Sequence, residues 1–316
     1  MDEWDELELR YKPKGNYKMH DENKNALLNN YVVPPFSVLD TKAGYWQDRK
    51  KQLFDYVGDS TKGRHVETIS SNLIEMNSTS MFDPVLCEII YKWYCPTNGK
   101  IIDCFAGGAV RGLMAYKFGY SYIGIDLSRK QIEENVKRAK QLRIKPNNGL
   151  VWKCDDSLNI DKYAQDGSFD LLFTCPPYFN LEVYSDDNRD ISNMNIVEFE
   201  KTYKMILQKT VNKLKNNRFA VIVVGNVRNE DGVYIDLVGM TNKIMEQCGC
   251  GLYNDCVLLE ALGSAPIRAS RMFGSYRKQI HVHQNVLVYY KGVPNKKNLK
   301  KFIMINIYTK EQREES

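Results

Sequence analysis

The chain has 316 residues, of which 43% are hydrophobic, and its formal net charge is +5. This length and apolar content suit one large α/β domain with additions better than several small modules. No stretch approaches the roughly 18 uninterrupted apolar residues of a membrane-spanning helix, so we expect a cytoplasmic protein without membrane contacts. The eight cysteines show no CxxC spacing, which argues against the usual zinc and redox motifs.

The first 75 residues predict an arm that packs on a larger domain. They are polar and rich in Lys and Asn, with one apolar island, YVVPPFSVLD, and an aromatic-basic stretch, GYWQDRKKQLF. A helix is predicted next, over residues 83–93, because Leu86, Ile89, Ile90 and Trp93 recur at helical spacing. The main domain is expected at residues 76–302, followed by a tail at 303–316.

From residue 100 on, short β-branched or aromatic runs alternate with amphipathic stretches. Seven runs have the character of strands: KIIDCF, SYIGID, LVWKC, DLLFTC, RFAVIVVGN, DCVLLEA and NVLVYYK. Strands that alternate with helices predict βαβ units and a doubly wound, mostly parallel sheet of the Rossmann-like type. The last two runs are joined by a basic block, so they could form an antiparallel pair.

The ends of the first three strands predict a nucleotide-like cofactor site. The first strand ends in DCFAGG, where glycines let the backbone approach a ligand, and the second ends at Asp126, where a carboxylate can accept both hydroxyls of a ribose. The third ends near Asp156, which can accept the amine of an adenine ring or can instead cap the next helix. The groups expected at the cofactor are Asp103, Phe105, Ala106, Gly107, Gly108, Asp126, Leu127, Asp156 and Ser157.

The fourth strand leads into the most specific motif of the chain, Cys175-Pro176-Pro177-Tyr178. Two prolines fix φ and carry no N–H, so their carbonyls can point into a site while the tyrosine ring is held beside it. The motif resembles the (Asp/Asn/Ser)-Pro-Pro-(Tyr/Phe) signature of amino-methyltransferases, with cysteine in the first place. In that family the first residue and a proline carbonyl accept protons of an exocyclic amine while the aromatic ring stacks the flipped base, which implies these roles for Cys175, Pro176 and Tyr178.

This likeness extends over most of the chain. VPPFSVLD, DCFAGGAVRG, GIDLS, CPPY and HQNVLVYYKG resemble segments of phage and prophage DNA modification methylases of the N6-adenine/N4-cytosine class. The resemblance implies a class I S-adenosylmethionine-dependent methyltransferase fold over residues 76–302, with a seven-stranded sheet whose last strand is reversed. It implies S-adenosylmethionine as the methyl donor, with Phe82, Asp83 and Pro84 at its methionine part.

The same resemblance implies a site-specific enzyme that acts on double-stranded DNA in a bacterial cytoplasm, and we favour N6 of adenine over N4 of cytosine as the acceptor. Target recognition is expected in two segments outside the common sheet, residues 179–195 and 264–283. From Ala261 to Phe302 the chain has nine Lys or Arg and no acidic residue, a composition that suits phosphate contacts or a solvated loop. The DNA contacts expected are Arg268, Arg271, Arg277 and Lys278, whereas His281 and His283 suit loop or packing positions equally well.

Three alternatives stay open at this point. The Cys175 thiolate could attack C6 of a pyrimidine, so that C5 of cytosine is methylated or otherwise modified. The amino-methylation could act on RNA or on a protein glutamine, since a Pro-Pro-Tyr loop also suits planar amides. Finally, the chain could be a catalytically silent methyltransferase fold that binds DNA without modifying it.

Overall fold

The computed structural model describes residues 27–28, 30–57, 67–68, 81–145, 149–179, 182–183, 187–260, 262 and 265–302. Contacts divide the chain into a large unit, Phe36–Ile303, and a second unit formed by Met1–Pro35 and Met304–Ser316. All elements discussed below belong to the large unit. Its boundary differs from the predicted one at residue 75, because part of the predicted arm joins the main sheet. The predicted tail, 303–316, lies outside the described residues.

The large unit is built on an eight-stranded sheet with the order β1-β11-β12-β8-β6-β3-β4-β5. Its strands are β1 (Val38–Asp40), β3 (Lys100–Asp103), β4 (Ser121–Asp126), β5 (Leu150–Cys154), β6 (Phe169–Thr174), β8 (Leu214–Val224), β11 (Cys250–Leu259) and β12 (His283–Lys291). Five neighbouring strands, β5, β4, β3, β6 and β8, are parallel to one another, whereas β12 is antiparallel to both β8 and β11. The predicted mostly parallel sheet with a reversed last strand is therefore confirmed.

The expected number of seven strands is wrong, because β1 adds an eighth at the edge. This three-residue strand comes from the apolar island of the predicted arm and pairs in parallel with β11, Val38 opposite Val257. The Val257 N–H donates to the Ser37 carbonyl over 2.8 Å, and the Thr41 hydroxyl donates to the Leu259 carbonyl over 2.6 Å. So short a strand has no periodicity of its own, so only its pairing partner reveals it.

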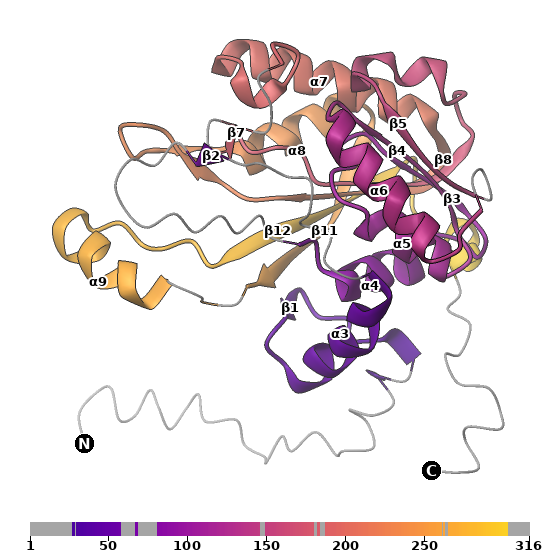
Figure 1. Cartoon of the computed structure of the whole chain (residues 1–316), viewed down its shortest axis with the longest axis horizontal. Coiled ribbons are helices and arrows are strands. Elements are labelled where there is room, and N and C mark those ends of the chain that lie inside the picture. Colours follow the sequence, from indigo (N-terminus) through magenta and orange to yellow (C-terminus); the bar gives the residue numbers. More distant parts are fainter. Residues whose placement is uncertain are drawn as a thin grey trace. The chain divides into compact units, whose positions relative to one another are not determined.

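Helices cover both faces of this sheet (Figure 1). The helices of the large unit are α3 (Gly44–Val57), α4 (Pro84–Tyr94), α5 (Val110–Lys117), α6 (Arg129–Gln141), α7 (Ile196–Lys213), α8 (Leu237–Gln247), α9 (Ala265–Tyr276) and α10 (Lys296–Leu299). Because strand residues alternate between faces, Ile102, Leu172 and Leu287 join the core beneath α7 and α8. On the other face, Tyr91 of α4 meets Phe173 of β6 edge to face at 5.6 Å.

Short elements complete the described part of the unit. They are the two-stranded pairs of β2 (Glu67–Thr68) with β7 (Glu182–Val183) and of β9 (Val227–Arg228) with β10 (Tyr234–Ile235), and the 3-10 turns η1 (Ser157–Lys162), η2 (Ile191–Asn193) and η3 (Lys300–Phe302). Within the ranges described, no helix combines the length and apolarity needed to cross a bilayer.

Gly112 of α5 provides a test of the packing between this helix and β5. A Cβ built at Gly112 would lie 2.5 Å from a ring carbon of Trp152 and 2.9 Å from a methyl of Leu150. We expect Gly112→Ala to lower the free energy of unfolding by about 1–3 kcal/mol, because overpacking outweighs the better helix propensity of alanine. Urea denaturation measures this. Gly44→Ala, where nothing lies within 4 Å, is the matched control, and equal effects of the two substitutions would contradict the packing assignment.

Candidate functional site

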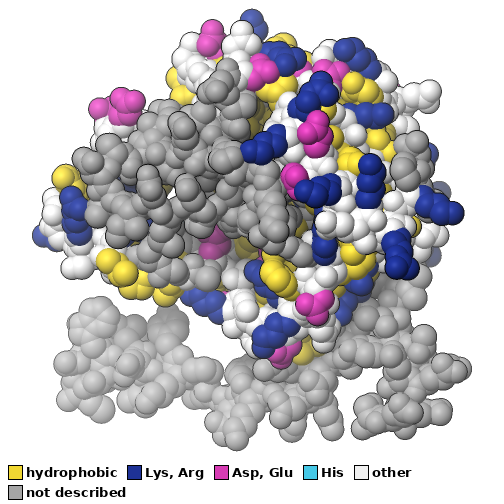
Figure 2. Space-filling model, viewed as in Figure 1, with side chains coloured by type: hydrophobic (Ala, Val, Ile, Leu, Met, Phe, Trp, Pro, Cys, Tyr) yellow, Lys and Arg dark blue, Asp and Glu magenta, His cyan; other side chains and the backbone are white. Residues whose placement is uncertain are grey.

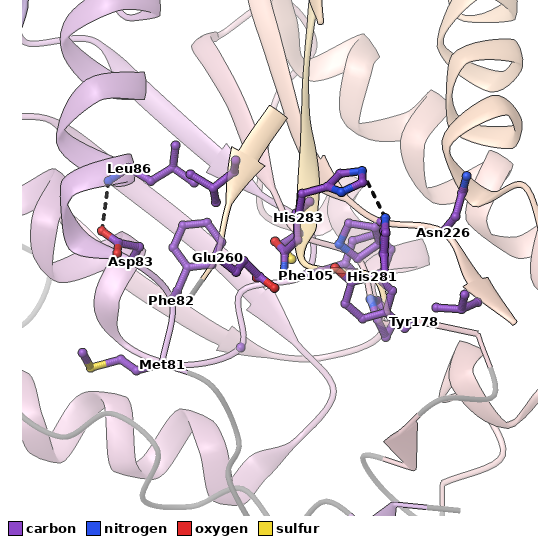
Figure 3. A pocket seen from close by; sticks show the side chains of 18 of the residues that line it. Met81, Phe82, Asp83, Leu86, Phe105, Tyr178, Asn226, Glu260, His281 and His283 are labelled. Carbon is purple, nitrogen blue, oxygen red and sulfur yellow. Dashed lines mark hydrogen bonds between the residues drawn. The ribbon is translucent and has the colours of Figure 1, made fainter. Parts of the chain in front are cut away.

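The sheet opens into a cleft of about 1030 Å³ at the edge where its parallel strands end. Gly107 after β3, Asp126 at the end of β4 and Tyr178 after β6 all line this cleft. The reversed strand β12 begins at the same edge with His283. The glycine turn, the acid and the diproline corner, which were predicted separately, thus open into one space, with Phe82 on one side and Tyr178 and His281 on the other (Figure 3).

The glycine turn and Asp126 are held together by backbone hydrogen bonds. Gly107 has φ of +49°, and its N–H donates to Asp126 Oδ2 over 2.7 Å, while Asp126 Oδ1 accepts the Ser128 N–H over 2.9 Å. Asp126 lines the cleft, and a carboxylate is an acceptor that suits hydroxyl donors. Phe105 and Leu127 also line the cleft, whereas Gly108 does not.

Beneath the turn lies a buried ion pair that the sequence pattern did not reveal. Arg111 of α5, only 4% exposed, donates from Nε to Asp103 Oδ2 over 2.6 Å and from Nη2 to the carbonyls of Phe105 (2.5 Å) and Ala106 (3.0 Å). Burial by itself lowers the pKa of Arg111, but the charge of Asp103 raises it above its ordinary value. The guanidinium also lies 4.6 Å from the Phe82 ring centre, so it ties the turn to the wall of the cleft.

Asp103 and Ala106 therefore differ from expectation. Both are buried and neither lines the cleft. The Asp103 carboxylate already accepts from Arg111, from the hydroxyls of Tyr122 and Thr174, each over 2.7 Å, and from the Phe105 N–H over 3.1 Å. With four internal donors, this acid shapes the turn from below instead of meeting a ligand.

Asp156 is a helix cap that also lines the cleft. Its Oδ1 accepts the Leu158 N–H over 2.8 Å and so caps η1, and the residue also lines the cleft together with Ser157. Its neighbour Asp155 does not line the cleft. A hydrogen bond from the Tyr163 hydroxyl, with smaller contributions from neighbouring donors, lowers the pKa of Asp155 to about 2.

The start of α4 forms the opposite wall. Phe82 and Asp83 line the cleft, but Pro84 is buried as the first residue of the helix. Asp83 Oδ1 caps α4 by accepting the Val85 N–H over 2.8 Å, and Asp83 Oδ2 pairs with Lys50 over 2.9 Å. The predicted helix at 83–93 is confirmed within one residue at each end. Asp83, which was predicted as its first residue, is the N-cap.

All four residues of the diproline motif line the cleft. Thr174, which precedes the motif, is fully buried, and its hydroxyl donates to Asp103. This bond links the start of the motif to the ion pair beneath the glycine turn. Tyr178 packs partly buried against the core cluster and approaches the bare backbone of Gly225, where a Cβ would lie 3.6 Å from the tyrosine oxygen. A Cβ at Gly225 would therefore be in ordinary van der Waals contact with this ring.

The two predicted recognition segments are placed differently. Arg268 and Lys278 line the cleft, whereas Arg271 and Arg277 are exposed outside its lining. In the other segment, 179–195, Asp190 and Ile191 line the cleft, and residues 180, 181 and 184–186 lie outside the described part of the chain.

Several cleft residues were not singled out from the sequence. Glu260, directly after β11, lines the cleft, and burial raises the pKa of its carboxyl. His281 and His283, considered loop or packing residues, also line it, as does Arg228, whose guanidinium lies 3.8 Å from the Tyr234 ring centre. The signal that could have found them is position, since Glu260 directly follows β11, and His281 and His283 stand just before and at the start of β12.

No protein-family model matches the sequence, and no curated protein matches it. Among similar solved structures, TrmN from Thermus thermophilus is 13% identical with a TM-score of 0.44, over 67% of this chain and 50% of TrmN, so the chain spans about half the length of that protein. A SAM-dependent methyltransferase from Methanosarcina mazei is 15% identical with a TM-score of 0.42, over 64% of this chain and 96% of its own. The cyclase SpnF is 12% identical with a TM-score of 0.47, over 78% of this chain and 97% of its own.

The strand order carries the assignment of the fold. Parallel strands β5, β4, β3, β6 and β8 follow one another across the sheet, and β12 is inserted in reverse between β8 and β11. The order reverses direction between β3 and β6, and the cleft lies at the carboxyl ends of these strands, as expected for a doubly wound fold. The chain has the Rossmann-like α/β fold of class I S-adenosylmethionine-dependent methyltransferases.

Proposed function

We propose that this protein transfers a methyl group from S-adenosylmethionine to an exocyclic amino nitrogen of a base in duplex DNA, with N6 of adenine favoured over N4 of cytosine. The observation that carries the proposal is the shared cleft, because the Gly107 turn, Asp126 and the Cys175–Tyr178 corner face one space of about 1030 Å³. A donor and an acceptor held at these two places can meet.

The cofactor half of the cleft fits S-adenosylmethionine. The Asp126 carboxylate is oriented by two backbone N–H groups and can accept the two ribose hydroxyls, and Asp156 can accept the adenine amine. Gly107, without a Cβ and at positive φ, lets the backbone come close to the ligand. The Phe82 ring, which lies against the Arg111 guanidinium and lines the cleft, would cover the methionine end. When bound, this cofactor supplies a methyl group made electrophilic by a sulfonium.

The other half of the cleft suits a flat base. An amino nitrogen conjugated with a ring is a poor nucleophile, and inside a duplex it is out of reach, so the base must first be flipped out. Cys175, Pro176 and Tyr178 line the cleft. We assign to Cys175 and the Pro176 carbonyl the role of accepting the amine hydrogens and orienting the nitrogen, and to Tyr178 that of stacking the ring. The chain's contribution to the rate is then mainly positioning.

Helix α9 supports a nucleic acid as the partner. Of its residues only Ala265 is buried, and Ile267, Phe273 and Tyr276 are among the exposed large hydrophobic side chains. Basic and hydrophobic side chains lie together at this end of the molecule (Figure 2). Aromatic rings interleaved with arginines suit both stacking on bases and contact with phosphates.

Methyl incorporation tests the substrate class. The purified protein, given S-adenosylmethionine with a labelled methyl group, is expected to label duplex DNA above tRNA and above a ribosomal protein mixture. Preferential labelling of tRNA or protein would contradict DNA as the substrate. No labelling of any polymer, together with no binding of S-adenosylmethionine by calorimetry, would indicate a silent fold.

Arg271 and Arg277, the exposed arginines of the predicted recognition segment 264–283, should contribute to DNA binding and not to the chemistry in the cleft. We expect Arg271→Gln/Arg277→Gln to weaken DNA binding roughly 10-fold or more at 0.1 M salt and to reduce the slope of log affinity against log salt by about two, because two phosphate contacts are lost. Fluorescence anisotropy at several salt concentrations measures both. Lys140→Ala, an exposed cation on α6, is the control. An unchanged slope in the double variant would remove α9 from the interface.

Cys175 separates amino-methylation from pyrimidine C5 chemistry. We expect Cys175→Ser to keep methyl transfer within a few-fold, because a serine hydroxyl is of similar size and a better hydrogen-bond acceptor than a thiol. Initial rates with the labelled donor measure this. Complete loss of activity, with a covalent complex of the unsubstituted protein on DNA that contains 5-fluorocytosine, would instead identify Cys175 as a nucleophile.

A further inference from the structure

Two histidines at the entry to β12 share one hydrogen bond. His281 Nε2 and His283 Nε2 lie 3.1 Å apart, and their ring centres are separated by 4.1 Å. A bond between two imidazole nitrogens needs a hydrogen on one and a lone pair on the other. If the His281 Nε2–H donates to His283, the lone pair of His281 lies on its Nδ1.

This pair lies near Tyr178, the ring that we propose stacks on the target base. Both histidines line the cleft. At Gly225 a Cβ would lie 3.5 Å from His281 Cε1 and 3.6 Å from the Tyr178 oxygen, so the imidazole and the phenol both lie beside Gly225. Figure 3 shows His281 and Tyr178 on the same side of the cleft, with a dashed line that joins His281 to His283.

The groups around His281 favour a neutral ring. Arg228 of β9 and Tyr234 of β10 face it from one side, with the Tyr234 ring centre at 6.1 Å, His283 contacts it directly, and Glu260 lines the cleft from the end of β11. Partial burial, then the neighbouring His283, then the charge of Arg228, lower the pKa of His281 below its ordinary value. A neutral imidazole can accept a proton at neutral pH.

We propose that His281, supported by His283, accepts the proton that the target amine must lose when it is methylated. In this step the carbon–sulfur bond breaks as the nitrogen–carbon bond forms, and an N–H bond breaks in the same transition state. Its electron pair stays on nitrogen, the proton goes to His281 Nδ1, and the sulfonium leaves as a neutral thioether. The Nε2 proton can pass on to His283 and from there to water. The inference rests on the proposed function and adds a proton acceptor to it.

The pH dependence of single-turnover methyl transfer tests this role. The unsubstituted protein should lose activity as pH falls through the pKa of His281, because the protonated ring cannot accept. We expect His281→Gln to slow transfer about 100-fold and to abolish this acid limb. His283→Gln should instead move the acid limb to higher pH, because the influence of His283 that lowers the pKa of His281 is removed.

Controls separate this inference from the proposed function. Val282→Ala lies between the two histidines but outside the cleft lining and should behave as the unsubstituted protein. Binding of S-adenosylmethionine, measured by calorimetry, should not change in either histidine variant. If the unsubstituted protein methylates DNA and His281→Gln keeps both its rate and its acid limb, the proton-acceptor role is overturned while the proposed function stands. If His281→Gln does not fold, an unmoved acid limb in His283→Gln overturns the role equally well.

Discussion

Replacing Arg111 with methionine is expected to lower the free energy of unfolding by about 3–5 kcal/mol, the usual effect of removing one partner of a buried ion pair. The substitution leaves the Asp103 carboxylate without its cation at a site with no exposed surface. It also releases the carbonyls of Phe105 and Ala106, which Arg111 holds on the inner side of the glycine turn. We therefore expect weaker S-adenosylmethionine binding as well as lower stability.

Urea denaturation and calorimetry measure the two effects. Lys137→Met, which removes an exposed pair with Glu134 on α6, should change stability by less than about 0.5 kcal/mol. The pair Arg111→Met/Asp103→Leu should not restore stability fully, because Tyr122 and Thr174 also donate to Asp103. A stability of Arg111→Met within 1 kcal/mol of the original would show that the ion pair does not organise the turn.

The second large effect concerns Asp126. We expect Asp126→Ala to weaken S-adenosylmethionine binding roughly 10- to 100-fold, because hydrogen bonds to a charged group are worth about 1.5–3 kcal/mol. Isothermal titration calorimetry measures the affinity, and the folded state is checked by circular dichroism.

Asp155→Asn is the matched control for this prediction. Asp155 also follows a strand at the same edge of the sheet, but it is bonded to Tyr163 and Asn159 and does not line the cleft. Its substitution should leave the affinity unchanged. If Asp126→Ala and Asp155→Asn affect binding equally, Asp126 is not a cofactor ligand.

The parts of the site that follow from local rules could be predicted from the sequence. Gly107, Asp126 and Tyr178 each stand where a parallel strand ends, and such ends meet at one edge of a doubly wound sheet, so their shared cleft could be expected. The helix at α4 could be predicted from its apolar spacing. The cap at Asp83 could not be distinguished from a ligand, because either role places an acid at the start of a helix.

The missed features depend on contacts between distant segments. Arg111 looks like an ordinary polar residue of an amphipathic helix, and its burial becomes visible only when Asp103 is found 2.6 Å away. The same contact explains why Asp103, expected at the cofactor, is turned into the interior. Strand β1 exists because β11 offers an edge, and His281 belongs to the site because β12 pairs with β8, which brings His281 beside Gly225. None of these follows from periodicity or local propensity.

Mass spectrometry of nucleosides tests the central claim most directly. Unmethylated plasmid DNA is incubated with the purified protein and S-adenosylmethionine that carries a trideuterated methyl group, then digested to nucleosides. We predict the deuterated methyl group on an exocyclic amine, as N6-methyldeoxyadenosine or, second in preference, N4-methyldeoxycytidine. Label on C5 of cytosine alone, or unlabelled DNA from a protein that binds the cofactor, would contradict amino-methylation of DNA in this cleft.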